Sequence, residues 1–164
     1  MQIETDFFPG AIGAIAKFHG EYYAKHWGFP VAFEAKVAAG VGAFAQRKSD
    51  KDLVMLAVDE QGLAASLTLD LGDSDSGDRG AHLRWFFADD RCRGTGLGRQ
   101  LMTRAMAHAD AHANGKAWLT TFAGLKPALA LYEAFGFELA EEFDGAMWGI
   151  GVQGQEFRRA PGRS

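Results

Sequence analysis

A glycine-dense turn constrains this chain more than any other feature. The six residues Arg93–Gly98 (RGTGLG) lie between an apolar run, Leu83–Ala88, and a helical pattern that begins near Leu97. In such a turn the backbone N–H groups point outward, the helix dipole favours negative charge, and glycine lets a ligand approach the backbone closely. The turn therefore predicts a site for a phosphorylated ligand. It is not a P-loop, because no Lys-Ser/Thr pair follows the last glycine, and its spacing does not fit G-x-G-x-x-G.

A second segment, Ala128–Phe137 (ALALYEAFGF), has the pattern of a helix that ends at a glycine and is followed by a strand. Gly136 fits a helix C-cap there, because the position after the last turn often needs a positive φ.

Both segments resemble signatures of one superfamily. The spacing Arg93-x-x-Gly96-x-Gly98 is similar to the R/Q-x-x-G-x-G/A signature of GNAT-superfamily N-acetyltransferases, and Ala128–Phe137 is similar to their A-x-x-L-Y-E-K-x-G-F segment. The resemblance implies that acetyl-CoA is the co-substrate and that the turn holds its pyrophosphate. We expect no metal cofactor.

A closer likeness is to the acetyltransferase half of bacterial proteins that fuse a MarR-type DNA-binding domain to a GNAT domain. No winged-helix segment precedes it here, so we expect no inherited DNA-binding role. The segments that carry this likeness are Tyr22-Tyr23, Trp27-Gly28-Phe29, Phe33-Glu34, His82–Phe86, Thr121–Leu125 and Trp148-Gly149.

Length and composition bound the class of protein. The chain has 164 residues, 48% of them hydrophobic, which predicts a single domain over 1–157 followed by a frayed tail over 158–164. The net charge of −4 gives no electrostatic footprint for nucleic acid, and no apolar stretch has a membrane-spanning length. The single cysteine, Cys92, excludes an internal disulfide and fits a reducing compartment. We expect a cytoplasmic protein with no nucleic-acid or membrane partner, and the sequence leaves a homodimer open.

The apolar periodicity predicts the order β-α-α-β-β-β-α-β-α-β-β, which is the order of the GNAT fold. The expected class is therefore α/β (α+β), with a mixed, mostly antiparallel sheet of about seven strands flanked by about four helices. The expected strands are 1–6, 53–58, 63–69, 81–88, 118–122, 137–141 and 146–152, and the helices begin near Pro9, Phe33, Leu97 and Pro127.

Acyl transfer needs a held donor and a polarised carbonyl. The resemblance implies that a backbone N–H on the strand before the turn polarises the carbonyl, and by spacing this group falls on Phe87 or Ala88. The expected CoA-binding residues are Phe86, Phe87, Ala88, Arg93, Gly94, Thr95, Gly96, Leu97, Gly98, Arg99 and Tyr132. Leu125 occupies the position of a family asparagine that contacts CoA, so one side-chain hydrogen bond is not expected here.

The leaving thiolate and the attacking amine both need proton transfer. Tyr132 occupies the family position that protonates the thiolate, and a phenol of pKa about 10 can protonate a thiolate whose thiol pKa is about 8.5. The alternative is a tyrosine that packs on CoA without acid–base duty. Cys92 lies beside the turn, but with no histidine adjacent in sequence we expect an ordinary cysteine.

An aliphatic ammonium of pKa about 10.4 must lose its proton before it attacks. Strand alternation predicts His82, Arg84, Phe86 and Ala88 on one face, with His82 about where several GNAT enzymes place a catalytic glutamate. If His82 is the base, kcat/KM should rise through an apparent pKa in the neutral range. A purely structural histidine is the alternative. Glu34 is the second candidate base. The alternative is that Glu34 is an ordinary helix carboxylate exposed to solvent.

The acceptor site is predicted less sharply. Arg84 is a candidate clamp for a substrate carboxylate, with a surface ion pair as the alternative. Aromatic residues on the first two helices, which wall the acceptor cleft in this superfamily, are candidate substrate contacts unless they are core residues. They are Tyr22, Tyr23, His26, Trp27 and Phe33.

Two sequence patterns resemble metal-binding motifs, but both are incomplete. His108-x-x-x-His112 lacks a third ligand, and the polar run 73–78 has neither the glycine nor the glutamate that an EF-hand requires.

The predicted function is transfer of an acetyl group from acetyl-CoA to the primary amine of a small molecule, by direct attack in a ternary complex. An amino-acid-like or carboxylate-bearing amine is one candidate acceptor. The alternative function is a non-catalytic acyl-CoA-binding sensor or interaction domain.

Overall fold

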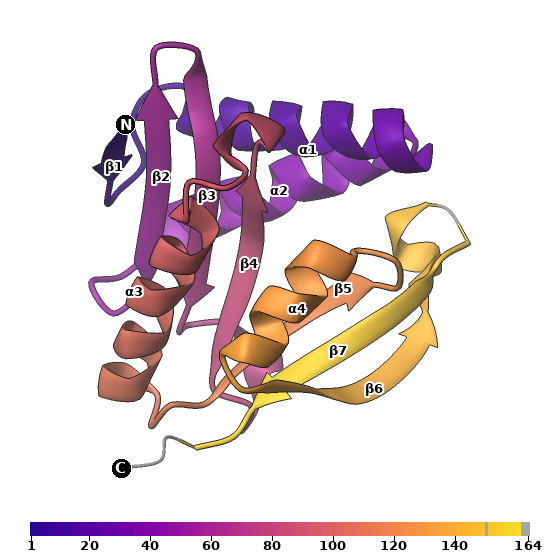
Figure 1. Ribbon diagram of the computed structural model, residues 1–164. Coiled ribbons are helices and arrows are strands. Elements are labelled where there is room, and N and C mark those ends of the chain that lie inside the picture. The colour runs from indigo at the N-terminus through magenta and orange to yellow at the C-terminus, as the bar shows by residue number, and fades with distance from the viewer. Residues whose placement is uncertain (150, 162–164) are drawn as a thin grey trace.

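The computed structural model describes residues 1–149 and 151–161. Within them, seven strands form one sheet in the order β1-β2-β3-β4-β5-β7-β6, and four α-helices flank it (Figure 1). The strands are β1 (Gln2–Glu4), β2 (Leu53–Asp59), β3 (Gly62–Asp70), β4 (Ala81–Ala88), β5 (Ala117–Phe122), β6 (Phe137–Asp144) and β7 (Gln153–Arg159). The helices are α1 (Ala11–Trp27), α2 (Val31–Arg47), α3 (Leu97–His112) and α4 (Lys126–Ala134). The predicted fold class is confirmed.

Two apolar clusters hold the layers together. Buried residues of α1 and α2, such as Ile15, Val41 and Phe44, pack on one face of the sheet. Buried residues of α3, such as Leu101 and Met102, pack on the other face, where α4 also lies (Figure 1). No helix in the described part of the chain is long and apolar enough to cross a membrane.

The sheet splits between β4 and β5. These strands are parallel and pair only at Ala81 with Ala117 and at His82 with Trp118, whereas every other neighbouring pair of strands is antiparallel and paired over a longer run. Beyond His82 the strands diverge, and β5, β7 and β6 lean away from β4 (Figure 1). Hydrogen-bonding groups on that edge of β4 are therefore left open to a ligand.

A β-bulge interrupts β4. Pairing passes from Thr68–Arg84 to Ser66–Phe87, and Trp85 has a φ of 49°. The side chains of Arg84 and Trp85 consequently both face α2, and Phe86 turns to the α3–α4 face. The prediction that His82, Arg84, Phe86 and Ala88 share a face is wrong for Phe86 and Ala88, because the bulge breaks the alternation.

The C-terminal strands differ from the sequence prediction. The segment expected as a strand, 146–152, contains the end of a 3₁₀ helix, Gly145–Trp148, and Gly149 with a φ of 79°. The last strand is instead β7, whose polar sequence QGQEFRR gave no strand signal. Arg158 and Arg159, placed in the predicted tail, belong to β7. Residue 150 of the predicted strand and residues 162–164 of the predicted tail lie outside the described residues.

Candidate active site

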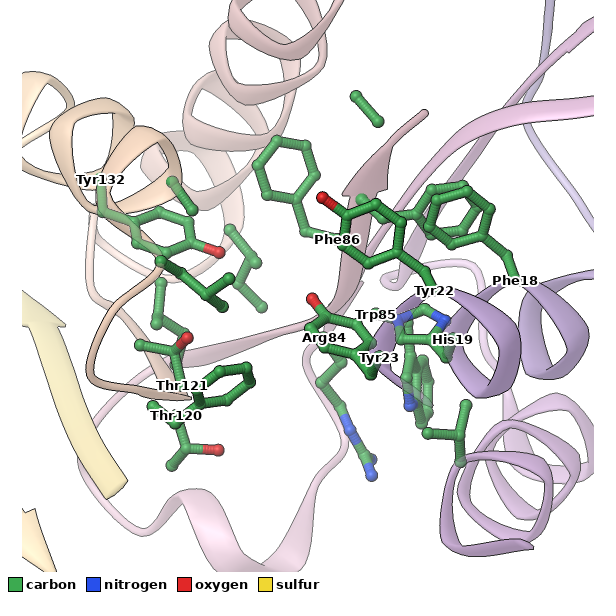
Figure 2. Close-up of a pocket in the computed structure, with 18 of the residues that line it drawn as sticks. Phe18, His19, Tyr22, Tyr23, Arg84, Trp85, Phe86, Thr120, Thr121 and Tyr132 are labelled. Carbon is green, nitrogen blue, oxygen red and sulfur yellow. The ribbon is translucent and has the colours of Figure 1, made fainter. Parts of the chain in front are cut away.

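A cleft of about 920 Å³ opens where the sheet splits, with β4 and β5 as its floor and residues of α1, α2 and α4 as its walls. Figure 2 shows side chains from these elements converging on it: Tyr132 from α4, Thr120 and Thr121 from β5, and Tyr22 and Tyr23 from α1. The cleft therefore joins segments that are more than a hundred residues apart in sequence.

The glycine turn lies at one end of this cleft. Gly94 and Gly96 have φ values of 75° and 79°, and a Cβ on either would meet nothing within 4 Å. Among the described residues, no acceptor takes the backbone N–H groups of Gly94, Gly96, Gly98 and Arg99. These open donors at the N-terminus of a sixteen-residue helix form an anion cradle.

Side chains around the turn hold its shape. The Thr95 hydroxyl donates to the Cys92 carbonyl at 2.6 Å and accepts the Leu97 N–H at 3.3 Å. Leu97 itself is buried in the core, so only its backbone faces a ligand. Cys92 is also buried, which raises the pKa of its thiol and argues against a nucleophilic role.

The predicted cations of the turn are both at the surface. Arg93 pairs with Asp90 at 2.9 Å, and hydrogen bonding to Asp90, with a smaller contribution from Tyr22, raises its pKa. Arg99 is exposed, with its guanidinium 5.6 Å from the centre of the Phe135 ring.

The divergence of β4 from β5 exposes one particular backbone donor. The Asp89 N–H donates to the Ala64 carbonyl of β3 at 2.8 Å. Because alternate N–H groups of a strand point to opposite sides, the N–H of Ala88 points away from β3, toward the split. Of the two predicted carbonyl-polarising groups, the geometry favours Ala88. The side chain of Phe87 packs on Phe18 of α1, with ring centroids 3.7 Å apart.

Tyr132 projects from α4 into the cleft, and its ring lies 6.2 Å from the Phe86 ring, centroid to centroid (Figure 2). The residue is 6% exposed, and its hydroxyl has no hydrogen-bond partner in the described part of the chain. Burial, with a smaller contribution from Tyr23, raises the pKa of Tyr132 above its ordinary value. The phenol is therefore held protonated and free to donate.

His82 lies at the vertex of the split, where β4 and β5 make their last pair. Its Nδ1 is 2.7 Å from Asp73 Oδ2, and its ring stacks on Trp118 with centroids 3.7 Å apart. Burial lowers the pKa of His82 to about 4, and Asp73 offsets only part of that effect. The imidazole is thus neutral near pH 7, and a pKa this low places the inflection expected from His82 below the neutral range.

Arg84 is part of a charge network at the cleft floor. Asp70, whose side chain is fully buried, accepts two hydrogen bonds from Arg47 at 3.0 and 2.6 Å and one from Arg84 at 3.1 Å. Arg84 also lies 3.8 Å from Asp73, and its guanidinium stacks on Trp85 at 4.1 Å. The guanidinium lines the cleft, but an internal carboxylate already holds one side of it.

The predicted aromatic residues lie together on the α1–α2 wall. Tyr23 and Trp27 both pack edge-on against Phe122 of β5, with centroids 5.7 and 5.1 Å apart, and Phe33 packs on Tyr23 at 5.3 Å. These side chains therefore belong to the hydrophobic core and also line the cleft. Tyr22, Tyr23, His26, Trp27 and Phe33 all line the cleft.

Glu34 is not among the described residues that line the cleft. It is exposed on α2, and its carboxylate lies against Gly20 of α1. The geometry gives it no access to the split between the strands.

A histidine that was not singled out from the sequence also lines the cleft. His19 is 5% exposed, its Nδ1 lies 2.8 Å from the Ile15 carbonyl, and its ring meets the Phe87 ring edge-on at 5.3 Å. Burial lowers its pKa to about 4. Its spacing of four residues from Ile15, on the apolar stripe of α1, was the available signal.

The remaining motifs lie away from the cleft or change its lining. Leu125 lines the cleft at the start of α4, where the family asparagine would stand. The rings of His108 and His112 are 4.4 Å apart, and His108 Nε2 is 2.7 Å from the Lys51 carbonyl. The part of the chain that the structure describes has no group of three or more His, Cys, Asp or Glu side chains placed to hold a metal.

Comparisons with known proteins agree on one family. The model of the acetyltransferase (GNAT) family matches residues 17–137. No curated protein matches the sequence. Three solved structures of similar fold are a ribosomal-protein-alanine N-acetyltransferase from Brucella melitensis, yncA from Salmonella typhimurium with its cofactor acetyl-CoA, and an acyl-CoA N-acyltransferase from Pseudomonas aeruginosa.

Their likeness extends over nearly the whole chain. The Brucella protein is 15% identical, with a TM-score of 0.72 and coverage of 97% of this chain and 99% of its own. The Salmonella protein is 16% identical, with a TM-score of 0.69 and coverage of 100% and 95%. The Pseudomonas protein is 18% identical, with a TM-score of 0.69 and coverage of 98% and 100%. At these identities the structural likeness establishes the fold alone.

Proposed function

The chain belongs to the acetyltransferase (GNAT) family, and on that premise we propose that it transfers an acetyl group from acetyl-CoA to the primary amine of a small molecule. One observation carries the proposal: Gly98 of the glycine turn and Tyr132 line the same cleft, at the split between β4 and β5, and no described residue accepts from the Gly98 N–H or bonds to the Tyr132 hydroxyl.

The donor half of the site is built from backbone. The N–H groups of Gly94, Gly96 and Gly98 hold the pyrophosphate, and the open space beside the first two glycines admits it closely. Gly98 lies between Leu131 and Phe86, whose side chains line the path from the turn to the split. This donor set suits a diphosphate better than a metal or a cation. Phe86 and Leu131 then contact the pantetheine chain.

The carbonyl is polarised by the N–H of Ala88. This group points into the split, where it can donate to the thioester oxygen as negative charge develops there. The amine nitrogen attacks the carbonyl carbon, the C–S bond breaks, and the sulfur leaves as a thiolate. A backbone donor so placed is worth roughly 3–4 kcal/mol in the transition state.

Tyr132 supplies the proton that the thiolate takes up. Its raised pKa keeps the phenol protonated until sulfur, a stronger base in the departing thiolate than in the thioester, accepts the proton. The Tyr132 hydroxyl has no competing partner among the described residues, so no internal hydrogen bond must break first.

His82 takes the proton that the attacking ammonium must lose. It lies six residues before Ala88 on β4, which at about 3.3 Å per residue is longer than a hydrogen bond. The proton therefore passes to His82 through water in the cleft. His19, beside Phe87, is the competing base, and Glu34 is disfavoured because it lies outside the lining.

The acceptor occupies the α1–α2 side of the cleft, between Tyr22, Tyr23, Trp27 and Phe33, with Arg84 on its floor. The donors of the Arg84 guanidinium to which no described residue bonds suit an acceptor that carries a carboxylate.

The proposal also includes a cytoplasmic location, a single domain over 1–157 and a likeness to MarR-fused acetyltransferases.

A thiol-release assay tests the proposal. Acetyl-CoA and a panel of primary amines, with and without a carboxylate, are mixed with the protein, and both the free CoA and the acetylated product are quantified. We expect release that depends on the amine, with intersecting double-reciprocal lines, as a ternary complex requires. Tight acetyl-CoA binding with no amine-dependent release would instead establish the non-catalytic acyl-CoA sensor.

A further inference from the structure

The loop between β3 and β4 holds His82 from one side. Asp73 precedes the 3₁₀ helix Ser74–Ser76, and its carboxylate accepts the Asp75 N–H at 2.9 Å while its Oδ2 lies 2.7 Å from His82 Nδ1. The Asp73 side chain is 11% exposed, so this contact is shielded from bulk water. The loop therefore delivers a fixed carboxylate to one nitrogen of the imidazole.

The same loop fixes the ring on which His82 stacks. The Trp118 Nε1–H donates to the Ser76 hydroxyl at 3.0 Å, and the Arg79 guanidinium lies 3.6 Å from the Trp118 ring. His82 is 3.7 Å from that indole at an interplanar angle of 12°. Arg79 and His82 both lie within 3.7 Å of the Trp118 ring, too close for them to occupy the same face of it. The Trp118 ring is therefore sandwiched between Arg79 and His82. Arg79 is held in turn by Glu156 at 2.6 Å.

We propose that Asp73 is a positioning residue that fixes His82 in the Nδ1–H tautomer, so that Nε2 offers its lone pair to the cleft as the proton acceptor. The inference rests on the proposed function, in which His82 is the base. It adds Asp73 as the residue that prepares His82 for that role.

The chemistry follows from the donor inventory. A neutral imidazole has one N–H donor and one acceptor nitrogen, and an ionised carboxylate only accepts. The hydrogen between Asp73 and His82 therefore belongs to Nδ1, which leaves Nε2 as the acceptor. In the described part of the chain Nε2 has no hydrogen-bond partner, and His82 lines the cleft.

Burial keeps the His82 ring neutral near pH 7 against the carboxylates that face it. His82 faces Asp73 from the loop, Arg84 from its own strand and Asp70 from β3, while the Arg79–Glu156 pair lies across Trp118. Burial outweighs the two carboxylates, and the pKa of His82 falls to about 4.

Long-range ¹⁵N–¹H NMR of the histidine rings tests the tautomer without reference to activity. In the wild-type protein at pH 7, we expect His82 to carry its proton on Nδ1 and an unprotonated Nε2. In Asp73→Asn the side-chain amide can donate to Nδ1, so the Nε2–H tautomer should gain population. Asp78→Asn, an exposed carboxylate of the same loop, is the matched control and should leave the His82 pattern unchanged.

Kinetics supply the second arm. Asp73→Asn should lower kcat by about 10- to 100-fold, less than a whole general base contributes, with little change in the KM for acetyl-CoA. An Nε2–H or doubly protonated His82 in the wild-type protein would overturn the proposal, as would an Asp73→Asn enzyme as fast as its parent. Absence of acetyl transfer in the wild-type protein would instead refute the proposed function, whatever the tautomer.

Discussion

Tyr132 and His82 line one cleft, and each has a polar atom there that makes no hydrogen bond to a described residue. Burial keeps each group in the protonation state that its role requires, while it makes the phenol a weaker acid and the imidazole a weaker base. It raises the pKa of the phenol, which stays protonated and can donate, and it lowers the pKa of the imidazole, which stays neutral and can accept. One environment thus prepares an acid and a base with opposite duties.

Replacing Tyr132 by Phe should lower kcat roughly 10²-fold with little change in the KM for acetyl-CoA. The ring that packs on Phe86 is kept, and only the proton donor is lost. Steady-state thiol release measures the effect. A variant as fast as the parent would reduce Tyr132 to a packing residue.

Replacing His82 by Ala should lower kcat/KM without changing the shape of its pH profile between pH 6 and 8. Since the pKa of His82 is about 4, the base is lost only as the pH falls toward that value, and the amine's own ionisation shapes the neutral range. His19→Phe, which keeps an aromatic ring beside Phe87, is the control and should retain activity. Loss of activity in His19→Phe alone would transfer the base role to His19. Melting curves of both variants exclude a folding defect.

At the scale of elements, the bulge in β4 arranges the site. It sends Arg84 and Trp85 to the α2 face and Phe86 to the α3–α4 face, so one strand serves the acceptor and the donor halves of the cleft. Sequence could predict the strand, because AHLRWFFA is apolar and bounded by turns. It could not predict the bulge, because no glycine or proline marks it and the positive φ falls on Trp85.

The glycine turn and the helices were predictable for a different reason. Their signals are local: glycines at fixed spacing before Leu97, and apolar residues every three or four positions along α1 and α2. The His82–Asp73 contact joins a strand to a loop through tertiary packing, and β7 is a strand because β5 and β6 pair with it on both sides. Neither leaves a local pattern in the sequence.

Gly98→Glu should abolish acetyl-CoA binding while the protein stays folded. The new carboxylate enters the cradle, where it competes with the diphosphate for the helix N-terminus and repels it. Gly98→Ala is the matched control, because its methyl group would meet Leu131 and Phe86 at ordinary contact distances of 3.6 and 3.7 Å. Calorimetric titration with acetyl-CoA measures both. An unchanged affinity for acetyl-CoA in Gly98→Glu would show that the donor site is not at this turn.

At the scale of the whole molecule, the sheet remains one body although β4 and β5 part. At the floor of the cleft, Asp70 of β3 joins Arg47 of α2 to Arg84 of β4 and so ties the helix layer to the sheet. Burial alone would raise the pKa of Asp70, but the hydrogen bonds and charges of Arg47 and Arg84 outweigh it and lower the pKa.

Asp70→Asn should therefore lower the free energy of unfolding by about 2–3 kcal/mol near neutral pH. A carboxylate with a lowered pKa stabilises the fold above the pKa of the unfolded chain, near 3.8, and that stability is lost as the pH falls through the folded-state value. The difference between wild type and variant should thus shrink below about pH 4. Urea unfolding at several pH values measures it. Glu141→Gln, in an exposed pair with Arg158, should change little. A pH-independent difference would assign the effect to packing.

The position of bound acetyl-CoA in a crystal structure of the complex tests the central claim most directly. We expect the pyrophosphate on the N–H groups of Gly94, Gly96 and Gly98. We expect the thioester in the split between β4 and β5, with its carbonyl oxygen within hydrogen-bond distance of the Ala88 N–H and its sulfur beside the Tyr132 hydroxyl. A thioester bound outside the split, or a sulfur turned away from Tyr132, would contradict the account.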